Sequence, residues 1–311
     1  MLTRRDYLRF TAQAGAALAL PMPLFAQGAV LTRPVPKTGE QLPIIGLGSS
    51  ATFSQAAGAA DIEAIRSVFN AMLDNGGTVF DTAPGYGESE EVAARAVNEI
   101  GGRDRIFWAT KLNVAGRGAS ADPARAREQV ETSLRLLGRD SIDLIQVHNV
   151  ADLATQYTLL KEYKQAGRVR YIGTTSTFEG QYATLEQFIR DESPDFIGID
   201  YAVDNQTAEE RIFPLAQEHG VGVLCYLPFG RTRLWQRVEG HAVPAWAAEF
   251  GATTWAQFFL KFAASHPAVT VVTPATSKPH HMVDNMTAGR GRLPDDAERR
   301  RMIDFIAALP S

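Results

Sequence analysis

Four side chains that could carry out acid chemistry follow apolar, strand-like runs of the sequence. Asp81 ends the run "TVFD", and Tyr86 comes five residues later. Lys111 ends "WATK", and His148 follows "DLIQV". A tyrosine holds its proton at neutral pH, but an adjacent ammonium such as that of Lys111 stabilises the phenolate and makes the phenol a better acid. Asp81 would balance the lysine charge, because a partly buried lysine without a partner is costly.

The four groups suit one reaction. A neutral His148 could hydrogen-bond a substrate oxygen and orient it, while Tyr86 protonates that oxygen and a hydride reaches the carbon. General acid assistance of this kind is typically worth about 10²–10⁴ in rate. None of the four groups carries a hydride, so a cofactor must supply it. Taken singly, each residue has a structural explanation, and their occurrence together at strand ends indicates a site.

The elements that must position these residues alternate along the chain. Eight apolar runs have strand character and begin near residues 42, 78, 106, 143, 171, 196, 222 and 270, with helical patterns between them. Eight strands alternating with helices over roughly 250 residues are typical of a (β/α)8 barrel, in which catalytic groups gather at the carboxyl ends of the strands. The rival fold, a doubly wound sheet, would need a G-x-G-x-x-G fingerprint after its first strand. This sequence lacks it, since "GLGSSATF" supplies only the first two glycines.

Helix start and stop signals support this division. Residues 61–75 carry apolar side chains at helical spacing, with Asp61 as a candidate N-cap and Gly76-Gly77 as the stop. Asp122 and Gly138 bracket the helix that starts at Pro123. Asp152 and Gly167 bracket the next one. No linker-like segment interrupts the pattern, so we expect a single domain over residues 35–311.

The motifs "FDTAPGYGESEE", "ATKL" and "IQVHN", in this order, closely resemble those of the aldo-keto reductases. The resemblance runs from about residue 42 to residue 285. It implies a monomeric or loosely associated barrel that binds NADP(H) in extended form and reduces aldehydes or ketones to alcohols. It also implies that Tyr86 is the proton donor, that Lys111 and Asp81 are its supporting pair, and that His148 orients the carbonyl.

The same resemblance implies where the cofactor lies. Eight residues match cofactor-contacting positions: Thr175 and Ser176 at the nicotinamide amide, Tyr226 against the nicotinamide ring, Thr276, Ser277 and Lys278 at the extra phosphate, and Asp284 and Asn285 at adenine. Three departures matter. Relatives usually carry Ser-Asn in place of Thr175-Ser176 and Gln in place of Gly198, and lost polar partners could cost about 1–3 kcal/mol. Many also carry Arg where His281 stands, so the preference for NADPH over NADH is expected to be weaker.

The loops after the strands would form the substrate pocket, with Phe53 and Trp235 as apolar walls for a small carbonyl compound. His280-His281 could suggest a metal, but adjacent residues rarely converge on one ion and no carboxylate or cysteine cluster supports them. We therefore assign no metal.

Composition narrows the partners. The 311-residue chain is 45% hydrophobic and 21% charged, as expected for a globular protein. Its formal net charge of -4 argues against nucleic acid, which needs a basic surface. Cys225 is the single cysteine, which rules out an intrachain disulfide.

The N-terminal segment predicts export. "TRRDYLR" at residues 3–9 precedes a mostly apolar run from Ala12 to Phe25, which is too short and too broken by prolines to span a bilayer comfortably. The segment resembles a twin-arginine (Tat) signal. We expect residues 1–26 to form a signal peptide cleaved after Ala26, with the Tat machinery as partner and the periplasm as destination.

Two other functions stay open at the level of sequence. Lys111 on a barrel strand could act as the nucleophile of a Schiff-base aldolase. Alternatively, the altered amide-binding positions could mark a nucleotide-binding regulatory protein with little or no turnover.

Overall fold

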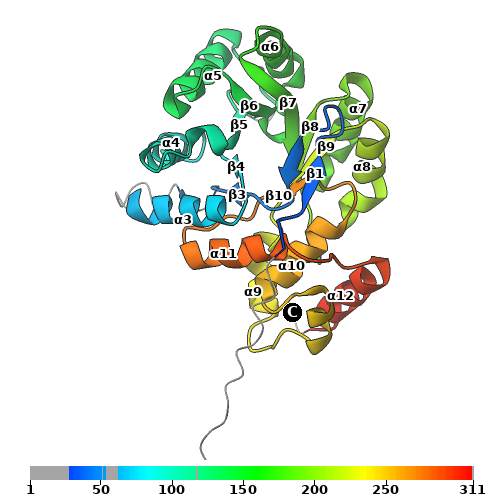
Figure 1. Ribbon diagram of the computed structural model, residues 1–311. Coiled ribbons are helices and arrows are strands. Elements are labelled where there is room, and N and C mark those ends of the chain that lie inside the picture. The colour runs from blue at the N-terminus through cyan, green and yellow to red at the C-terminus, as the bar shows by residue number, and fades with distance from the viewer. Residues whose placement is uncertain (1–27, 51, 54–61, 117, 310–311) are drawn as a thin grey trace, which may run out of the picture.

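The computed structural model describes residues 28–50, 52–53, 62–116 and 118–309 (Figure 1). Eight parallel strands form one sheet in which neighbours in the chain are neighbours in space, from β3 to β10. Parallel bridges from Ile45 to Val272 and from Gly48 to Ala275 join the two edges and close the sheet. Helices surround this ring of strands. The predicted (β/α)8 barrel is therefore confirmed.

The barrel strands fall on the eight apolar runs, although most are shorter: β3 Leu47–Gly48, β4 Val79–Asp81, β5 Phe107–Leu112, β6 Ile142–Val147, β7 Val169–Ser176, β8 Phe196–Asp200, β9 Gly222–Tyr226 and β10 Val271–Val272. The helices are α3 Ile62–Asp74, α4 Ser89–Glu99, α5 Pro123–Leu137, α6 Leu153–Gln165, α7 Tyr182–Glu192, α8 Thr207–Glu218, α9 Arg233–Arg237, α10 Trp255–Ser265, α11 Pro279–Ala288 and α12 Asp296–Ala308.

The predicted caps explain where two helices begin and end. The Asp122 carboxylate accepts a hydrogen bond from the Ala124 N–H at 2.8 Å, and Gly138 closes α5 with a φ of 62°. At α6, the Asp152 carboxylate accepts from the N–H of Thr155. Asp61, the predicted cap of α3, lies outside the described residues. The signal peptide predicted over residues 1–26 lies outside them too.

The amino end of the barrel is covered by an antiparallel hairpin of β1 Thr32–Pro34 and β2 Gln41–Pro43. Val35 and Leu42 of this hairpin are buried in one apolar cluster with residues of the barrel strands. Strand β1 starts three residues before residue 35, where we placed the start of the domain. Within the part of the chain that the structure describes, no helix is both long and apolar enough to cross a membrane.

The interior of the barrel is layered because side chains alternate between the two faces of each strand. The lower layer is apolar and includes Val79, Ala109, Leu144, Phe196 and Leu224, all buried in one cluster. Two residues further along each of these strands, the same face carries Asp81, Lys111, Gln146, Gly198 and Tyr226. This second layer, which we call the polar layer, is the floor of the candidate site.

Candidate active site

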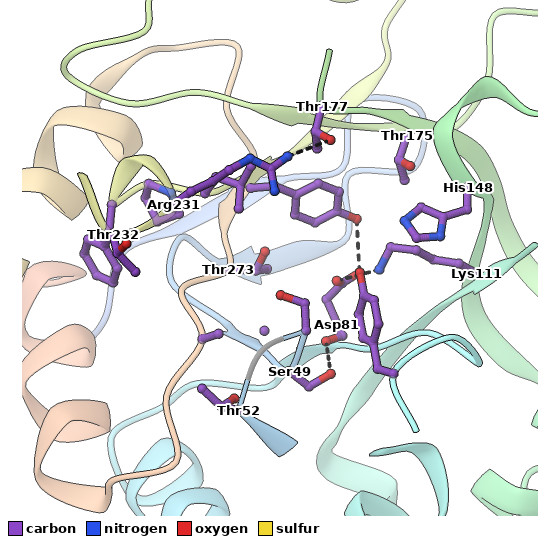
Figure 2. Close-up of a pocket in the computed structure, with 18 of the residues that line it drawn as sticks. Ser49, Thr52, Asp81, Lys111, His148, Thr175, Thr177, Arg231, Thr232 and Thr273 are labelled. Carbon is purple, nitrogen blue, oxygen red and sulfur yellow. Dashed lines mark hydrogen bonds and ion pairs between the residues drawn. The ribbon is translucent and has the colours of Figure 1, made fainter. Parts of the chain in front are cut away.

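The four predicted catalytic residues line one cavity of about 610 Å³ at the carboxyl ends of the strands. Figure 2 shows Asp81, Lys111 and His148 pointing into it. Asp81 and Lys111 rise from the polar layer, Tyr86 lies in the loop after β4, and His148 directly follows β6. Residues separated by up to 67 positions are thus brought together by the barrel. This is the arrangement that the strand-end pattern predicted.

Asp81 and Lys111 form a buried ion pair. The Lys111 ammonium donates to Asp81 Oδ2 and to the Thr82 carbonyl, both at 2.8 Å, and the two side chains are almost inaccessible to water. Burial by itself lowers the pKa of Lys111, but the charge of Asp81 and the contact with Tyr86 raise it above its usual value. Burial raises the pKa of Asp81, and the charge of Lys111 offsets this only in part. Lys111 is therefore a firmly held cation at neutral pH.

Tyr86 lies against this cation. The Lys111 ammonium is 5.2 Å from the centre of the Tyr86 ring, and the proximity of Tyr86 contributes to raising the pKa of Lys111. The ring is partly exposed and lines the cavity. A turn in which the Tyr86 N–H donates to the Ala83 carbonyl at 3.0 Å places it there. The phenol thus faces the cavity on one side and a fixed positive charge on the other.

His148 packs edge-to-face against Tyr86, with ring centres 6.2 Å apart. Burial, together with the charge of Lys111, lowers its pKa to about 4, so the imidazole is neutral at physiological pH. Its Nδ1 is buried and has no hydrogen-bond partner among the described residues. The following residues Asn149 and Val150 have φ values of 58° and 49°, an unusual backbone for residues other than glycine.

The cavity continues toward a second one of about 480 Å³, with Phe229, Trp235 and Ala275 lining both. Trp235 packs against Phe229 with ring centres 4.9 Å apart. In the second cavity, Asp284 accepts hydrogen bonds from Thr254 at 2.8 Å and from Gln257 at 2.7 Å. Two adjoining cavities of this kind fit an extended ligand rather than a compact one.

Asn285 gives the second cavity a polar group. It is 3% exposed and lines the cavity. Thr276 and His281 line the same cavity, beside the amino end of α11.

Several of the predicted cofactor residues lie elsewhere. Thr175 and Tyr226 line the first cavity, but Ser176 lines neither, and its hydroxyl lies 3.0 Å from Gln181 Oε1. Ser277 and Lys278 also line neither cavity. Lys278 is exposed and precedes the first residue of α11.

The prediction that Phe53 forms a substrate wall was wrong. Phe53 is fully buried and packs against Phe69 and Phe80, with ring centres 5.8 and 5.5 Å away. Phe80 alternates with the inward-facing Asp81, so its ring points out of the barrel toward α3, and Phe53 joins that outer cluster. Ser49 and Thr52 line the cavity in its place.

Two polar residues of the site were not singled out from the sequence. Gln146 is fully buried in the polar layer, where its side-chain oxygen accepts a hydrogen bond from the Tyr226 hydroxyl at 2.8 Å. Its place on the inward-facing register of the strand, two residues before His148, was the available signal. Arg231 lies at the rim, where its guanidinium donates to Thr177 Oγ1 at 3.2 Å and links the loops after β9 and β7 (Figure 2). No strand pattern points to a loop residue such as Arg231.

Comparison with known proteins identifies the class to which this barrel and site belong. The profile of the Aldo/keto reductase family matches residues 44–300, and the chain belongs to this family. Aldo-keto reductase YhdN of Bacillus subtilis (strain 168) is 33% identical over 198 residues, which cover 61% of this chain and 59% of that protein. Aldo-keto reductase str7 of Strobilurus tenacellus is 31% identical over 170 residues, covering 53% and 50%. The chain thus spans less than two thirds of these relatives' length in each match.

Solved structures show the same fold. The holo form of aldo-keto reductase AKR11C1 from Bacillus halodurans superposes with a TM-score of 0.70 and 26% identity, covering 89% of this chain and 96% of that one. An aldo/keto reductase from Klebsiella pneumoniae in complex with NADP and acetate gives a TM-score of 0.71 at 24% identity, covering 86% and 93%.

Proposed function

We propose that this protein is an NADP(H)-dependent oxidoreductase that reduces aldehydes or ketones to alcohols, with Tyr86 as the proton donor. The proposal depends mainly on one observation: Tyr86 lines the cavity and lies against the buried ion pair of Lys111 and Asp81. Family membership supports the reaction class, and solved relatives bound to NADP or NADPH support the cofactor. When bound, the nicotinamide supplies the hydride for the carbonyl carbon.

The residues present fit such a nucleotide. The first cavity offers the ring of Tyr226 and the hydroxyl of Thr175, and the adjoining cavity offers the amide of Asn285. The amino end of α11 has Lys278 as its N-cap with no side chain capping it, so its N–H groups favour an anionic group nearby. These features support extended binding across both cavities.

The proton moves by a short path in this proposal. The neutral His148 imidazole orients the carbonyl oxygen toward Tyr86, and the phenol donates its proton as negative charge builds on that oxygen. The charge left on the phenolate is stabilised by the Lys111 ammonium, which Asp81 and the Thr82 carbonyl hold in place. The alcohol leaves, and a proton from solvent restores the phenol.

The aldolase alternative has less support. A Schiff-base lysine must lose its proton to attack, and such lysines have a lowered pKa. The pKa of Lys111 is instead raised by its buried carboxylate partner. Borohydride trapping of a substrate adduct on Lys111 would favour the aldolase.

The weakly catalytic alternative is favoured by one observation. Ser176 lies off the cavity and Gly198 has no side chain, so two of the family's amide-holding groups are missing. Titration with NADPH, followed by a broad panel of carbonyl compounds, separates the two functions. Tight NADPH binding without turnover of any compound would support a binding protein.

Replacing His281 with Arg is expected to strengthen NADPH binding about fivefold with little effect on NADH. Burial and the neighbours His280 and Lys278 lower the pKa of His281, so it brings no charge to the extra phosphate at neutral pH. An exposed ion pair contributes up to about 1 kcal/mol, which corresponds to about fivefold. Fluorescence titration with each nucleotide measures the change. His281→Gln is the uncharged control, and equal gains for NADPH and NADH would contradict the assignment.

We also propose that the protein is exported to the periplasm by the Tat machinery. Changing Arg4 and Arg5 to lysine is expected to leave the protein inside the cell, because the arginine pair is the feature that such signals depend on. Cell fractionation with a cytoplasmic marker protein measures this. Equal periplasmic amounts of the variant and the wild type would contradict export by this route.

A further inference from the structure

The hydroxyl of Tyr226 lies at the centre of the polar layer. It is 3.1 Å from Asp81 Oδ1 and 2.8 Å from Gln146 Oε1, and all three side chains are buried. The other oxygen of Asp81, Oδ2, accepts from Lys111. Both oxygens of the catalytic carboxylate are therefore held, one by the ammonium and one by a phenol.

Gly198 makes this contact possible. It faces the barrel interior on β8, beside β9, which carries Tyr226. A Cβ atom on Gly198 would lie 2.7 Å from Cζ and 2.8 Å from the hydroxyl oxygen of Tyr226, and closer still to Cε2. These distances are far shorter than a van der Waals contact, so any side chain at this position would push the ring away from Asp81.

Tyr226 and Tyr86 flank the same lysine. The Lys111 ammonium is 5.2 Å from the centre of each ring. Both tyrosines line the cavity, but the Tyr226 hydroxyl is bound to the carboxylate partner of the lysine. The two rings and Asp81 thus enclose the ammonium within the site.

We propose that Tyr226 is a positioning residue for catalysis: its hydroxyl fixes the Asp81 carboxylate against Lys111, and Gly198 provides the space that this requires. The inference rests on the proposed function, because it assigns Tyr226 a part in supporting the proton donor. It adds to the ring stacking expected of Tyr226 in this family, since stacking needs only the ring and this role needs the hydroxyl.

Gln146 gives the hydroxyl a second place to donate. A phenol carries one proton, so it serves Asp81 or Gln146 but not both. While Asp81 is ionised, the carboxylate is the stronger acceptor and takes the bond. If Asp81 gains a proton, the carboxyl donates to the phenolic oxygen and the hydroxyl turns to Gln146. The network therefore stays satisfied in both states, and its preferred state depends on pH.

The charged groups around Asp81 come from several elements. Lys111 on β5 and Tyr226 on β9 contact it directly, and both hydrogen bonds lower the pKa of the carboxyl against the raising effect of burial. Tyr86, in the loop after β4, acts on Lys111 and Tyr226. Among the described residues, His148 and Glu90 interact electrostatically with Lys111, and in this way they are linked to Asp81.

Tyr226→Phe tests the role of the hydroxyl because it keeps the ring. We expect the acid limb of the kcat/KM profile to move to higher pH by about one unit, the size expected when a carboxylate loses one hydrogen bond. The NADPH dissociation constant should stay within about twofold, since the stacking face is intact. An unmoved acid limb would overturn the inference.

Gly198→Ala tests the same contact while the phenol is kept. The added methyl group should displace the Tyr226 ring and move the acid limb to higher pH, as Tyr226→Phe does. The double variant Gly198→Ala with Tyr226→Phe should show no shift beyond that of Tyr226→Phe alone. Tyr182→Phe is the matched control, because Tyr182 is also buried but has no hydroxyl partner among the described residues. A full additional shift in the double variant would show that the two residues act separately.

Thermal unfolding without nucleotide tests the contact independently of activity. The hydrogen bond to the ionised carboxylate is charge-assisted, so its extra strength is present above the pKa of Asp81 and is lost as pH falls through that pKa, while the neutral hydrogen bonds of the hydroxyl remain. Tyr226→Phe should therefore lower Tm at neutral pH, and the deficit should become smaller at acidic pH without disappearing. A deficit that does not change with pH would refute the inference even in an active reductase. A pH-dependent deficit in a protein without reductase activity would instead refute the proposed function.

Discussion

Tyr86→Phe is expected to reduce carbonyl reduction by at least about 10²–10⁴-fold, the range that a general acid contributes. The variant keeps the ring that packs against His148 but has no proton to give. The oxygen of the substrate would then carry its developing charge without a donor beside it. The initial rate of NADPH oxidation with simple aldehydes measures the loss. NADPH binding should be unchanged, because the proposed mechanism assigns the hydroxyl to the substrate and not to the nucleotide.

A second phenol near the same lysine makes the assignment of Tyr86 testable by comparison. The Tyr226 ring is as close to the Lys111 ammonium as the Tyr86 ring is. Its hydroxyl, however, is buried against Asp81 and Gln146, so it cannot replace the missing donor. If Tyr86→Phe retained most of the wild-type rate and Tyr226→Phe abolished it, the donor would have been assigned to the wrong phenol.

The barrel could be predicted because its signals are local. Apolar runs of strand length recur with helices between them, and residues such as Asp122 and Gly138 mark helix ends by chemistry that acts within a few positions. Closure of the barrel was harder to predict from pattern alone, since it depends on bridges between Ile45 and Val272, which lie far apart in the chain. The prediction that the sheet closes came instead from the number of strands, since eight strands alternating with helices are typical of a closed barrel.

The site was predicted in part, and the failures have physical causes. Residues at strand ends, such as Lys111, are fixed by the barrel geometry and could be placed by rule. Phe53 was misplaced because it follows a strand in a loop whose direction no local pattern specifies, and its ring joined the outer aromatic cluster. The bond from Tyr226 to Asp81 spans 145 positions and depends on the absence of a side chain at Gly198. From the sequence, Gly198 was interpreted as the loss of a polar partner for the nicotinamide amide. In the structure, the missing side chain leaves the space that the Tyr226 ring occupies.

Lys111→Met is expected to reduce both stability and activity. The substitution leaves Asp81 buried without its cation, and breaking one side of a buried pair costs about 3–5 kcal/mol of folding free energy. Part of this cost would be relieved because Asp81 takes up a proton, so the stability deficit should be larger at high pH than at low pH. The phenolate of Tyr86 would also lose its stabilising charge, and the loss of one such donor typically costs about 10²–10³ in rate. Denaturant unfolding and the aldehyde assay measure the two effects.

The double variant Asp81→Asn with Lys111→Met separates structure from chemistry. Removing both charges leaves no buried ion to desolvate, and a neutral pair of similar volume is often as stable as the ion pair it replaces. The Tyr226 hydroxyl can still donate to the amide oxygen of Asn. Stability should therefore recover most of its loss, while the rate stays low because no ammonium faces Tyr86. A double variant that regained both stability and reductase activity would show that the pair only holds the barrel together, and that the acidity of the site arises elsewhere.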